Sequence, residues 1–259
     1  MIHQAFKMKQ ALKYGVIAGL GAWLLCFPSL LRAQEKFPCW EFKIFGGFNI
    51  GGTSPLPLPE EIRSIDVFTP AWLAPHASLE VIRRLNRKWG IAVQLGLDHK
   101  GFTVTDRVKS LHTEIEMNDE VYSGNFTGKN TTRIRNSYIT LPVTATYRID
   151  RRWELHAGAY LAYLYGADFK GEASDGYIRQ GSPIGEKTIV DRAVFDFSDK
   201  QKSFDYGLLL AGEWTFYSRF ACRGQIAWGL CPLFPSNFTG VPVNMYNIYG
   251  GLGITYRLN

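Results

Sequence analysis

The sequence alternates between apolar and polar residues over long stretches, and this alternation limits the fold more than any other feature. In the final segment, NMYNIYGGLGITYRLN, bulky apolar side chains recur at every second position from Tyr246 to Leu258 except at Gly250. A period of two is typical of a β-strand whose two faces meet different environments. Seven further segments repeat the pattern, near residues 39–50, 72–85, 89–100, 138–149, 153–163, 204–216 and 220–230. The sequence therefore predicts eight two-faced strands.

The connections between these segments alternate between two kinds. Three are short enough for tight hairpin turns, at residues 86–88, 150–152 and 217–219. Four are long and are interpreted as loops, at about residues 51–70, 101–131, 167–202 and 231–241. Short turns at one end and long loops at the other are typical of an outer-membrane β-barrel. Because a sheet in lipid has to close, the last strand is expected to pair with the first. The predicted fold is all-β, an eight-stranded antiparallel up-and-down transmembrane β-barrel.

The charged residues of the strands lie on the face opposite the bulky apolar residues. Charges facing lipid are costly, so this face is expected to line the lumen. Acids and bases are nearly balanced on it, which predicts ion pairs across the lumen rather than a conducting pore. The predicted lumen charge network consists of Lys43, Glu80, Lys100, Arg148, Glu154, Glu213, Arg223 and Arg257. The alternative is a soluble lipocalin-like ligand-binding barrel, which would place apolar residues inside and charges outside.

The N-terminal segment has the features of an export signal. Lys9 and Lys13 precede an apolar run, and Ala33 stands at a plausible cleavage point. The sequence therefore predicts a signal peptide at residues 1–33 and an outer-membrane β-barrel domain at 34–259, exported by the general secretory route. The formal net charge is +6, and removing residues 1–33 leaves 25 basic against 23 acidic residues. That small excess gives no reason to expect nucleic-acid binding.

Two of the long connections contain candidate binding segments. The stretch SPLPLPEEIRS is stiffened by alternating prolines and is interpreted as a rigid binding loop or roof over the barrel, with Glu60, Glu61 and Arg63 beginning a short helical turn. Its candidate residues are Pro55, Pro57, Pro59, Glu60, Glu61 and Arg63. The stretch HTEIEMNDE, residues 112–120, carries oxygen ligands that suit a cation, and a solvated acidic loop is the simpler interpretation.

One constellation invites an enzymatic interpretation. His76, Ser78 and Glu80 share a strand face, and a lipid A-modifying barrel enzyme would need a nucleophile, a base and a carboxylate. Strand neighbours two apart are about 7 Å apart, so contact between them is not assured. Polar filling of the lumen is the preferred interpretation. We predict no enzymatic activity, no catalytic residue, no cofactor and no metal.

The whole pattern resembles the PorT-like family of Gram-negative outer-membrane β-barrel proteins. The stretches that carry this resemblance are GGFNIGGTSPLPLPEEIRSI, WGIAVQLGLDHKG, YITLPVTATYRI, YGLLLAGEWTF and GLGITYRL. The resemblance implies insertion by the barrel-assembly machinery and contact with outer-membrane lipid and lipopolysaccharide. It also suggests, as an alternative function, an accessory role in protein secretion. The predicted function is a non-enzymatic membrane scaffold or surface-binding protein, with a protein partner at its long extracellular loops.

Overall fold

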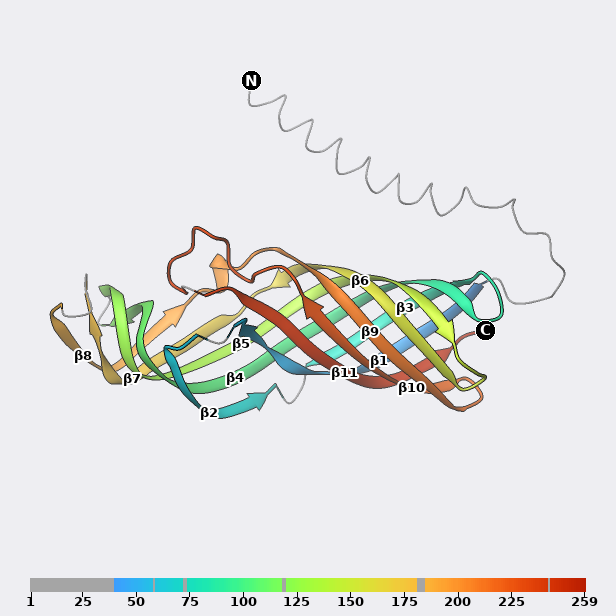
Figure 1. Ribbon diagram of the computed structural model, residues 1–259, viewed down its shortest axis with the longest axis horizontal. Coiled ribbons are helices and arrows are strands. Elements are labelled where there is room, and N and C mark those ends of the chain that lie inside the picture. Colours follow the sequence, from blue (N-terminus) through green and yellow to red (C-terminus); the bar gives the residue numbers. More distant parts are fainter. Residues whose placement is uncertain (1–39, 58, 72–73, 118–119, 181–184, 242) are drawn as a thin grey trace, which may run out of the picture. The chain divides into compact units, whose positions relative to one another are not determined.

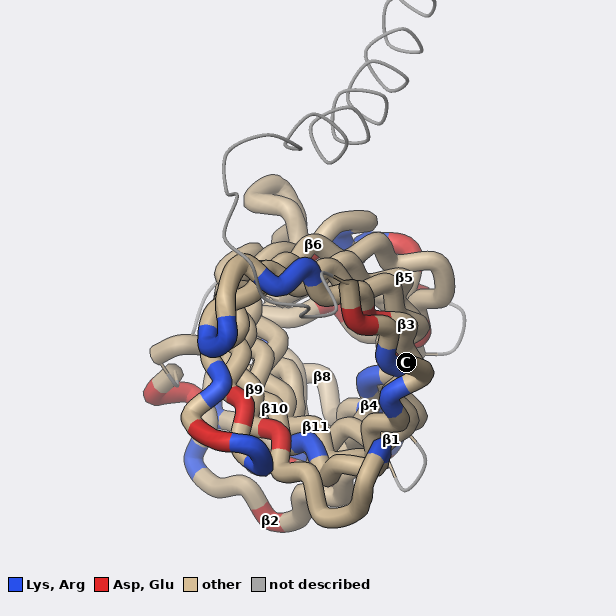
Figure 2. Tube along the Cα trace, turned by 90° about the vertical axis from the view of Figure 1, so that its right-hand side faces the viewer, with Lys and Arg blue, Asp and Glu red and all other residues tan. Residues whose placement is uncertain are grey.

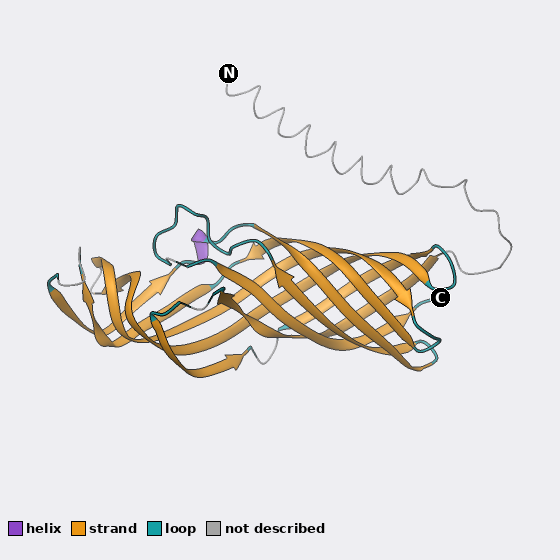
Figure 3. Ribbon diagram, in the orientation of Figure 1, coloured by secondary structure: helices purple, strands orange, loops and turns teal. Residues whose placement is uncertain are grey.

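The computed structural model describes residues 40–259 except 58, 72–73, 118–119, 181–184 and 242 (Figure 1). The described residues form an antiparallel sheet of eleven strands and one short 3₁₀ helix (Figure 3). The elements are β1 (Trp40–Pro55), β2 (Ile62–Pro70), β3 (Pro75–Arg84), β4 (Trp89–Met117), β5 (Glu120–Arg148), β6 (Trp153–Gly166), β7 (Phe169–Arg179), β8 (Lys187–Asp196), η1 (Ser198–Lys200), β9 (Phe204–Tyr217), β10 (Phe220–Gly229) and β11 (Met245–Arg257). The predicted signal peptide lies outside the described residues. No helix among them is long and apolar enough to cross a bilayer.

Eight of the described strands close into a ring. The order around it is β1, β3, β4, β5, β6, β9, β10, β11 and back to β1 (Figure 2). The last strand pairs with the first from Lys43–Arg257 to Pro55–Met245, so the predicted pairing of these two strands is confirmed. A closed ring leaves no row of unpaired backbone groups, which is what a sheet in lipid requires.

The predicted total of eight strands is wrong, because the sheet has eleven in the described part of the chain. β2, β7 and β8 lie in segments that were assigned as loops, and β4 and β5 each run for 29 residues. β7 pairs with the outer half of β5, β8 pairs with β7, and β2 pairs with β4. The bilayer limits only the apolar band. A strand can continue past this band where its apolar residues still alternate. In β4, Phe102, Val104 and Val108 keep this spacing, and the strand goes on pairing with β5.

The two faces of the ring have opposite character. Neighbouring residues of β1 make this plain, since Phe42 is 43% exposed and Ile44 41%, whereas Glu41 is 3% and Lys43 1%. The same alternation follows every strand of the ring. Charge inside and apolar side chains outside is the reverse of the lipocalin arrangement. Contact with lipid explains the exposed apolar band.

The end of the ring with the short turns carries an aromatic girdle. Trp40, Trp89, Trp153 and Trp214 are all exposed there, and exposed aromatic rings of this kind mark a membrane interface. Two of the turns share one device, in which a side-chain oxygen accepts from two backbone N–H groups. Asn86 Oδ1 accepts from the amides of Lys88 and Trp89, and Asp150 Oδ1 does so from those of Arg152 and Trp153, at 2.7–2.9 Å.

At the opposite end, the chain builds a second folded part that we call the outer module. It consists of β2, β7, β8, residues 197–200, residues 101–117 of β4, residues 120–135 of β5 and residues 231–241. It has its own core of buried aromatic and aliphatic side chains, distinct from the polar lumen. Within that core the ring centroids of Phe169 and Phe234 are 5.1 Å apart, and those of Phe195 and Phe197 are 5.2 Å apart. The long connections are therefore largely ordered sheet.

Candidate functional site in the barrel lumen

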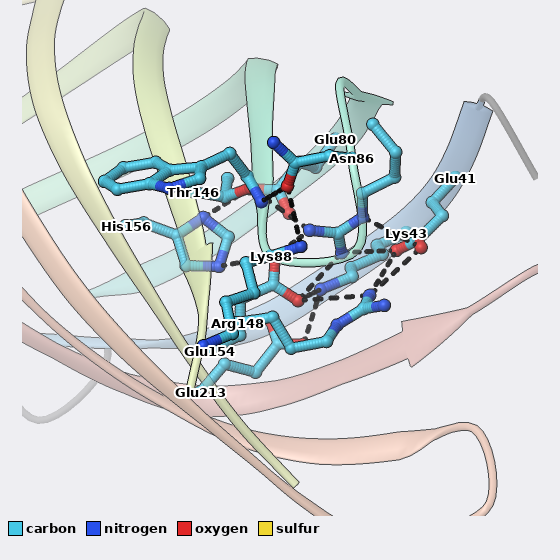
Figure 4. Close-up of polar contacts among 12 residues, drawn as sticks. Glu41, Lys43, Glu80, Asn86, Lys88, Thr146, Arg148, Glu154, His156 and Glu213 are labelled. Atoms are coloured by element: carbon cyan, nitrogen blue, oxygen red, sulfur yellow. Dashed lines mark hydrogen bonds and ion pairs between the residues drawn. The ribbon is translucent and has the colours of Figure 1, made fainter. Parts of the chain in front are cut away.

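The turn-side half of the lumen is filled by charged side chains that contact one another (Figure 4). We call this set the lumen charge network. It contains four acids and four bases: Glu41, Glu80, Glu154, Glu213, Lys43, Arg84, Arg148 and Arg223. Seven of the eight are buried, and Arg148 is partly exposed.

Arg84 is central to one half of the network. Its Nε and Nη2 donate to the two oxygens of Glu41 at 2.9 and 2.6 Å, which is the bidentate geometry that favours strong Arg–carboxylate pairs. Its Nη1 lies 2.8 Å from an oxygen of Glu154. Arg148 adds a second cation to Glu41, at 3.0 Å. Two carboxylates are thus shared by two guanidinium groups.

The other half of the network contains two ion pairs. The Lys43 ammonium lies 2.6 Å from Glu213 and 3.5 Å from Glu154, so it links the two halves. Arg223 donates from Nη1 to Glu80 at 2.7 Å, and both side chains are fully buried. The eight groups come from six strands of the ring, β1, β3, β5, β6, β9 and β10. Because removing one buried charge would leave its partner unpaired, the network fixes these strands relative to one another.

The predicted residues divide into three groups. Lys43, Glu80, Arg148, Glu154, Glu213 and Arg223 meet in the network. Lys100 lies in a separate layer, and Arg257 makes no ion pair among the described residues. Glu41 lies on the face that the sequence assigns to the lumen but is absent from the predicted network, and Arg84 was missed. Both could have been found from the alternation of their strands. Glu41 shares the buried face of β1 with Lys43, and Arg84 shares that of β3 with Glu80.

Lys100 occupies the middle of the lumen. Its ammonium lies 4.9, 5.2 and 5.5 Å from the ring centres of Tyr138, Tyr160 and Tyr249, and 3.8 Å from Asp205. Aromatic faces attract a cation, and the attraction strengthens where water is excluded. The Tyr160 hydroxyl donates to Asp205 at 3.0 Å. These side chains form a second layer in the lumen, separate from the charge network.

A cavity of about 430 Å³ lies beyond that layer, within the outer module. Its walls come from the outer ends of β1, β4, β5 and β11, from β2, β7 and β8, and from Gly240, Val241 and Val243. Most of the lining side chains are apolar, among them Phe68, Phe102, Phe126, Phe169, Phe195 and Met245. Asp106 is its one carboxylate among the described residues. Its side chain accepts from Asn130 Nδ2 at 3.2 Å.

A family profile described as the outer membrane protein beta-barrel domain matches residues 33–235, which is more than half of the chain. The chain belongs to that family. Its place is therefore the outer membrane.

Solved structures with a similar fold are distant in sequence. Ail, the attachment invasion locus protein of Yersinia pestis, in complex with the heparin analogue sucrose octasulfate, is 10% identical with a TM-score of 0.34, and the match covers 85% of this chain and 97% of that one. Ail in a phospholipid bilayer nanodisc is 12% identical with a TM-score of 0.34, over 84% and 99%. An outer-membrane channel of Pseudomonas putida F1 is 10% identical with a TM-score of 0.26, over 89% and 100%. No curated protein matched the chain.

The three residues considered for catalysis all point into the lumen of this outer-membrane barrel, and each is engaged elsewhere. Ser78 Oγ accepts from Gln94, His76 Nδ1 lies 3.1 Å from the Gln225 amide nitrogen, and Glu80 pairs with Arg223. No hydrogen bond joins any two of the three residues in the described structure. These contacts are those expected of polar side chains that fill the lumen, which is the interpretation that the sequence favours. The three side chains lie away from the lipid-facing surface.

Glu80, His156 and Glu213 place potential metal-ligand atoms within 4.8 Å of one another. Two of the three are already neutralised, because Glu80 pairs with Arg223 and Glu213 with Lys43. A cation would have to bind beside two buried positive charges. The donor set therefore fits an ion-pair network better than a metal centre.

The two segments considered for binding adopt strand structure at their ends. Residues 112–117 belong to β4 and Glu120 to β5, where Met117 pairs with Glu120, so the described part of the predicted acidic loop is paired strand. In the proline segment, Pro55 ends β1, Pro59 lines the cavity, and Arg63 lies in β2 rather than in a helical turn. The remaining candidates, Pro57, Glu60 and Glu61, lie in the connection between β1 and β2.

Asp106 makes a testable contribution to stability. Burial raises the pKa of this carboxyl to about 6, against the opposing effect of the Asn130 hydrogen bond, and nearby Asp66 adds to the rise. Because the pKa of Asp106 is higher in the folded protein than in the unfolded chain, its protonation favours folding. This contribution to stability is full below about pH 4 and is lost as the pH rises through about 6. We expect Asp106→Asn to raise the free energy of unfolding at pH 8 by on the order of 2 kcal/mol, and by much less at pH 4. Urea titrations of vesicle-inserted protein at both pH values measure this. An equal effect at both would contradict it.

Proposed function

We propose that this outer-membrane barrel is a non-enzymatic surface-binding protein, in which the ring is the membrane anchor and the outer module is the binding part. The observation that supports the proposal most is the lumen charge network. Its eight charged groups fill the turn-side half of the lumen and pair across six strands. A blocked lumen leaves the outer module as the part of the molecule that is available for function.

The composition of the network argues against ion selectivity. Its four acids and four bases are paired at short distances, so no single sign of charge remains to draw ions through. Small rings of this type enclose space for side chains and little more, whereas porins use about sixteen to eighteen strands. Together, these points favour a plugged anchor over a general diffusion channel.

Several finer assignments form part of the proposal. We infer that the protein is PorT-like, and that cleavage after Ala33 and the general secretory route precede insertion by the barrel-assembly machinery. Lipopolysaccharide and outer-membrane lipid then surround the apolar band. An accessory role in protein secretion is the alternative, and it would use the same outer module as a docking surface for a protein partner.

The proposal predicts that the purified protein does not conduct. In planar bilayers we expect no steady, large conductance, since the network and the Lys100 layer block the lumen. A general porin reconstituted at the same density is the positive control. Insertion is checked by the gel shift of unboiled samples, because a closed barrel resists unfolding by detergent. Steady, solute-permeable channels from the folded protein would overturn the plugged-anchor proposal.

A further inference from the structure

The cavity of the outer module is left unexplained by a role as anchor or scaffold. At about 430 Å³ it has the size of a small-molecule site. Apolar side chains from seven strands line it, and a tightly packed core would have filled such a space. We propose that it binds an apolar molecule carrying one protonated amine, with the amine facing Asp106. This proposal deepens the one above, on which it rests for the outer module as the binding part.

Asp106 is the feature that selects the amine. It is 6% exposed, it lies on the cavity wall, and no cation of the described chain pairs with it. The nearest basic side chain in sequence, Arg107, points to the other face of β4 and pairs with Asp66 at 3.0 Å. An acid buried without a cation is costly, and acids in such settings mark functional sites.

The groups that surround Asp106 fit a donor from the ligand. Asn130 Nδ2 donates to Asp106 Oδ1 at 3.2 Å and also contacts Thr132 Oγ1 at 3.2 Å, so the amide holds the carboxylate in place. His112 is the other titratable side chain on the cavity wall, and no Lys or Arg is among the described residues that line it. The site therefore offers one negative charge within an apolar enclosure. A ligand with a carboxylate of its own would be repelled.

One side of the cavity wall is not closed by backbone pairing among the described strands. β1 pairs with β3 only as far as Phe48–Pro75, and no backbone pairing joins its outer end to β2 in the described chain. Residues of β1 and β2 both line the cavity along this seam. The seam is covered by Phe68, which stacks on Phe102 with ring centres 5.6 Å apart and lies close to Gly52. An aromatic cover without hydrogen bonds suits the passage of an apolar molecule.

Binding of decylamine, decanol and decanoic acid tests the proposal, because these probes differ only in the polar group. Equilibrium dialysis is done with radiolabelled probes and with the full barrel in nanodiscs of uncharged phosphatidylcholine. Empty nanodiscs report partitioning into lipid. We expect saturable decylamine binding, weaker binding of decanol and the weakest binding of decanoic acid. In Asp106→Asn, decylamine affinity should fall at least about tenfold, as expected for a lost hydrogen bond to a charged group, while decanol affinity changes little.

Two variants complete the design. Asp199→Asn removes an exposed acid outside the cavity and should leave decylamine affinity unchanged. Val104→Trp fills the cavity and should abolish saturable binding of all three probes. The gel shift of unboiled samples shows that each variant is folded.

Three results would overturn the proposal: equal decylamine affinity in Asp106→Asn and the parent protein, decanoic acid binding as tight as decylamine, or no saturable binding to folded protein. The planar-bilayer recording tests the plugged-anchor function separately from the binding of decylamine. A conducting barrel that still bound decylamine would overturn the plugged-anchor function alone.

Discussion

Replacing Arg223 by methionine is expected to lower the free energy of unfolding by about 3–5 kcal/mol, since the change leaves a buried carboxylate without its partner. Arg223 is fully buried and lies 2.7 Å from Glu80. Among the described residues no other Lys or Arg lies within ion-pair distance of Glu80, and the His156 ring nitrogen is 3.8 Å away. Methionine keeps most of the volume, so the loss reports charge rather than packing. Urea unfolding from lipid vesicles, followed by the gel shift of unboiled samples, measures it.

The double variant Arg223→Met with Glu80→Gln separates pairing from other effects. Because it removes both charges, it should be more stable than Arg223→Met alone, whereas independent contributions would make it less stable. The exposed pair of Asp66 and Arg107 is the matched control, and Arg107→Met should cost less than about 1 kcal/mol. A double variant less stable than Arg223→Met would contradict the role that we give the network.

Replacing Phe169 by alanine should loosen the outer module while the ring stays closed. Phe169 is 3% exposed, and the rings of Phe195, Phe197 and Phe234 surround it at centroid distances of 5.1–6.5 Å. Truncating a buried phenylalanine costs about 3–5 kcal/mol. We expect trypsin to cleave the outer module of the variant in vesicles much faster than that of the parent protein.

The remaining fragment should still show the gel shift of a closed barrel, because the aromatic core is separate from the lumen charge network. Val121→Ala, at a position that is 70% exposed on β5, is the control and should leave cleavage unchanged. If Phe169→Ala abolished the gel shift, the outer module and the ring would form one cooperative unit, contrary to this prediction.

The sequence by itself determined the strands of the ring and the direction of their faces. Side chains of a strand alternate strictly, so Lys43, Glu154 and Arg223 could be assigned to the lumen from their phase alone. The tight turns could also be predicted from local sequence, since Asn86 and Asp150 accept hydrogen bonds from backbone amides two and three residues ahead. Family membership, and with it the outer-membrane location, agrees with the same pattern.

The tertiary structure alone decided the partners of those residues and the shape of the outer half. Lys43 pairs with Glu213, which is 170 residues away, and any acid on the lumen face has the right phase for that pairing. The strands β2, β7 and β8 exist because the extended β4 and β5 offer them edges, and an edge is a property of the assembled sheet. In the sequence alone, Asp106 likewise cannot be distinguished from the other polar residues of its segment. It becomes a lone carboxylate in an apolar cavity because several distant segments fold around it.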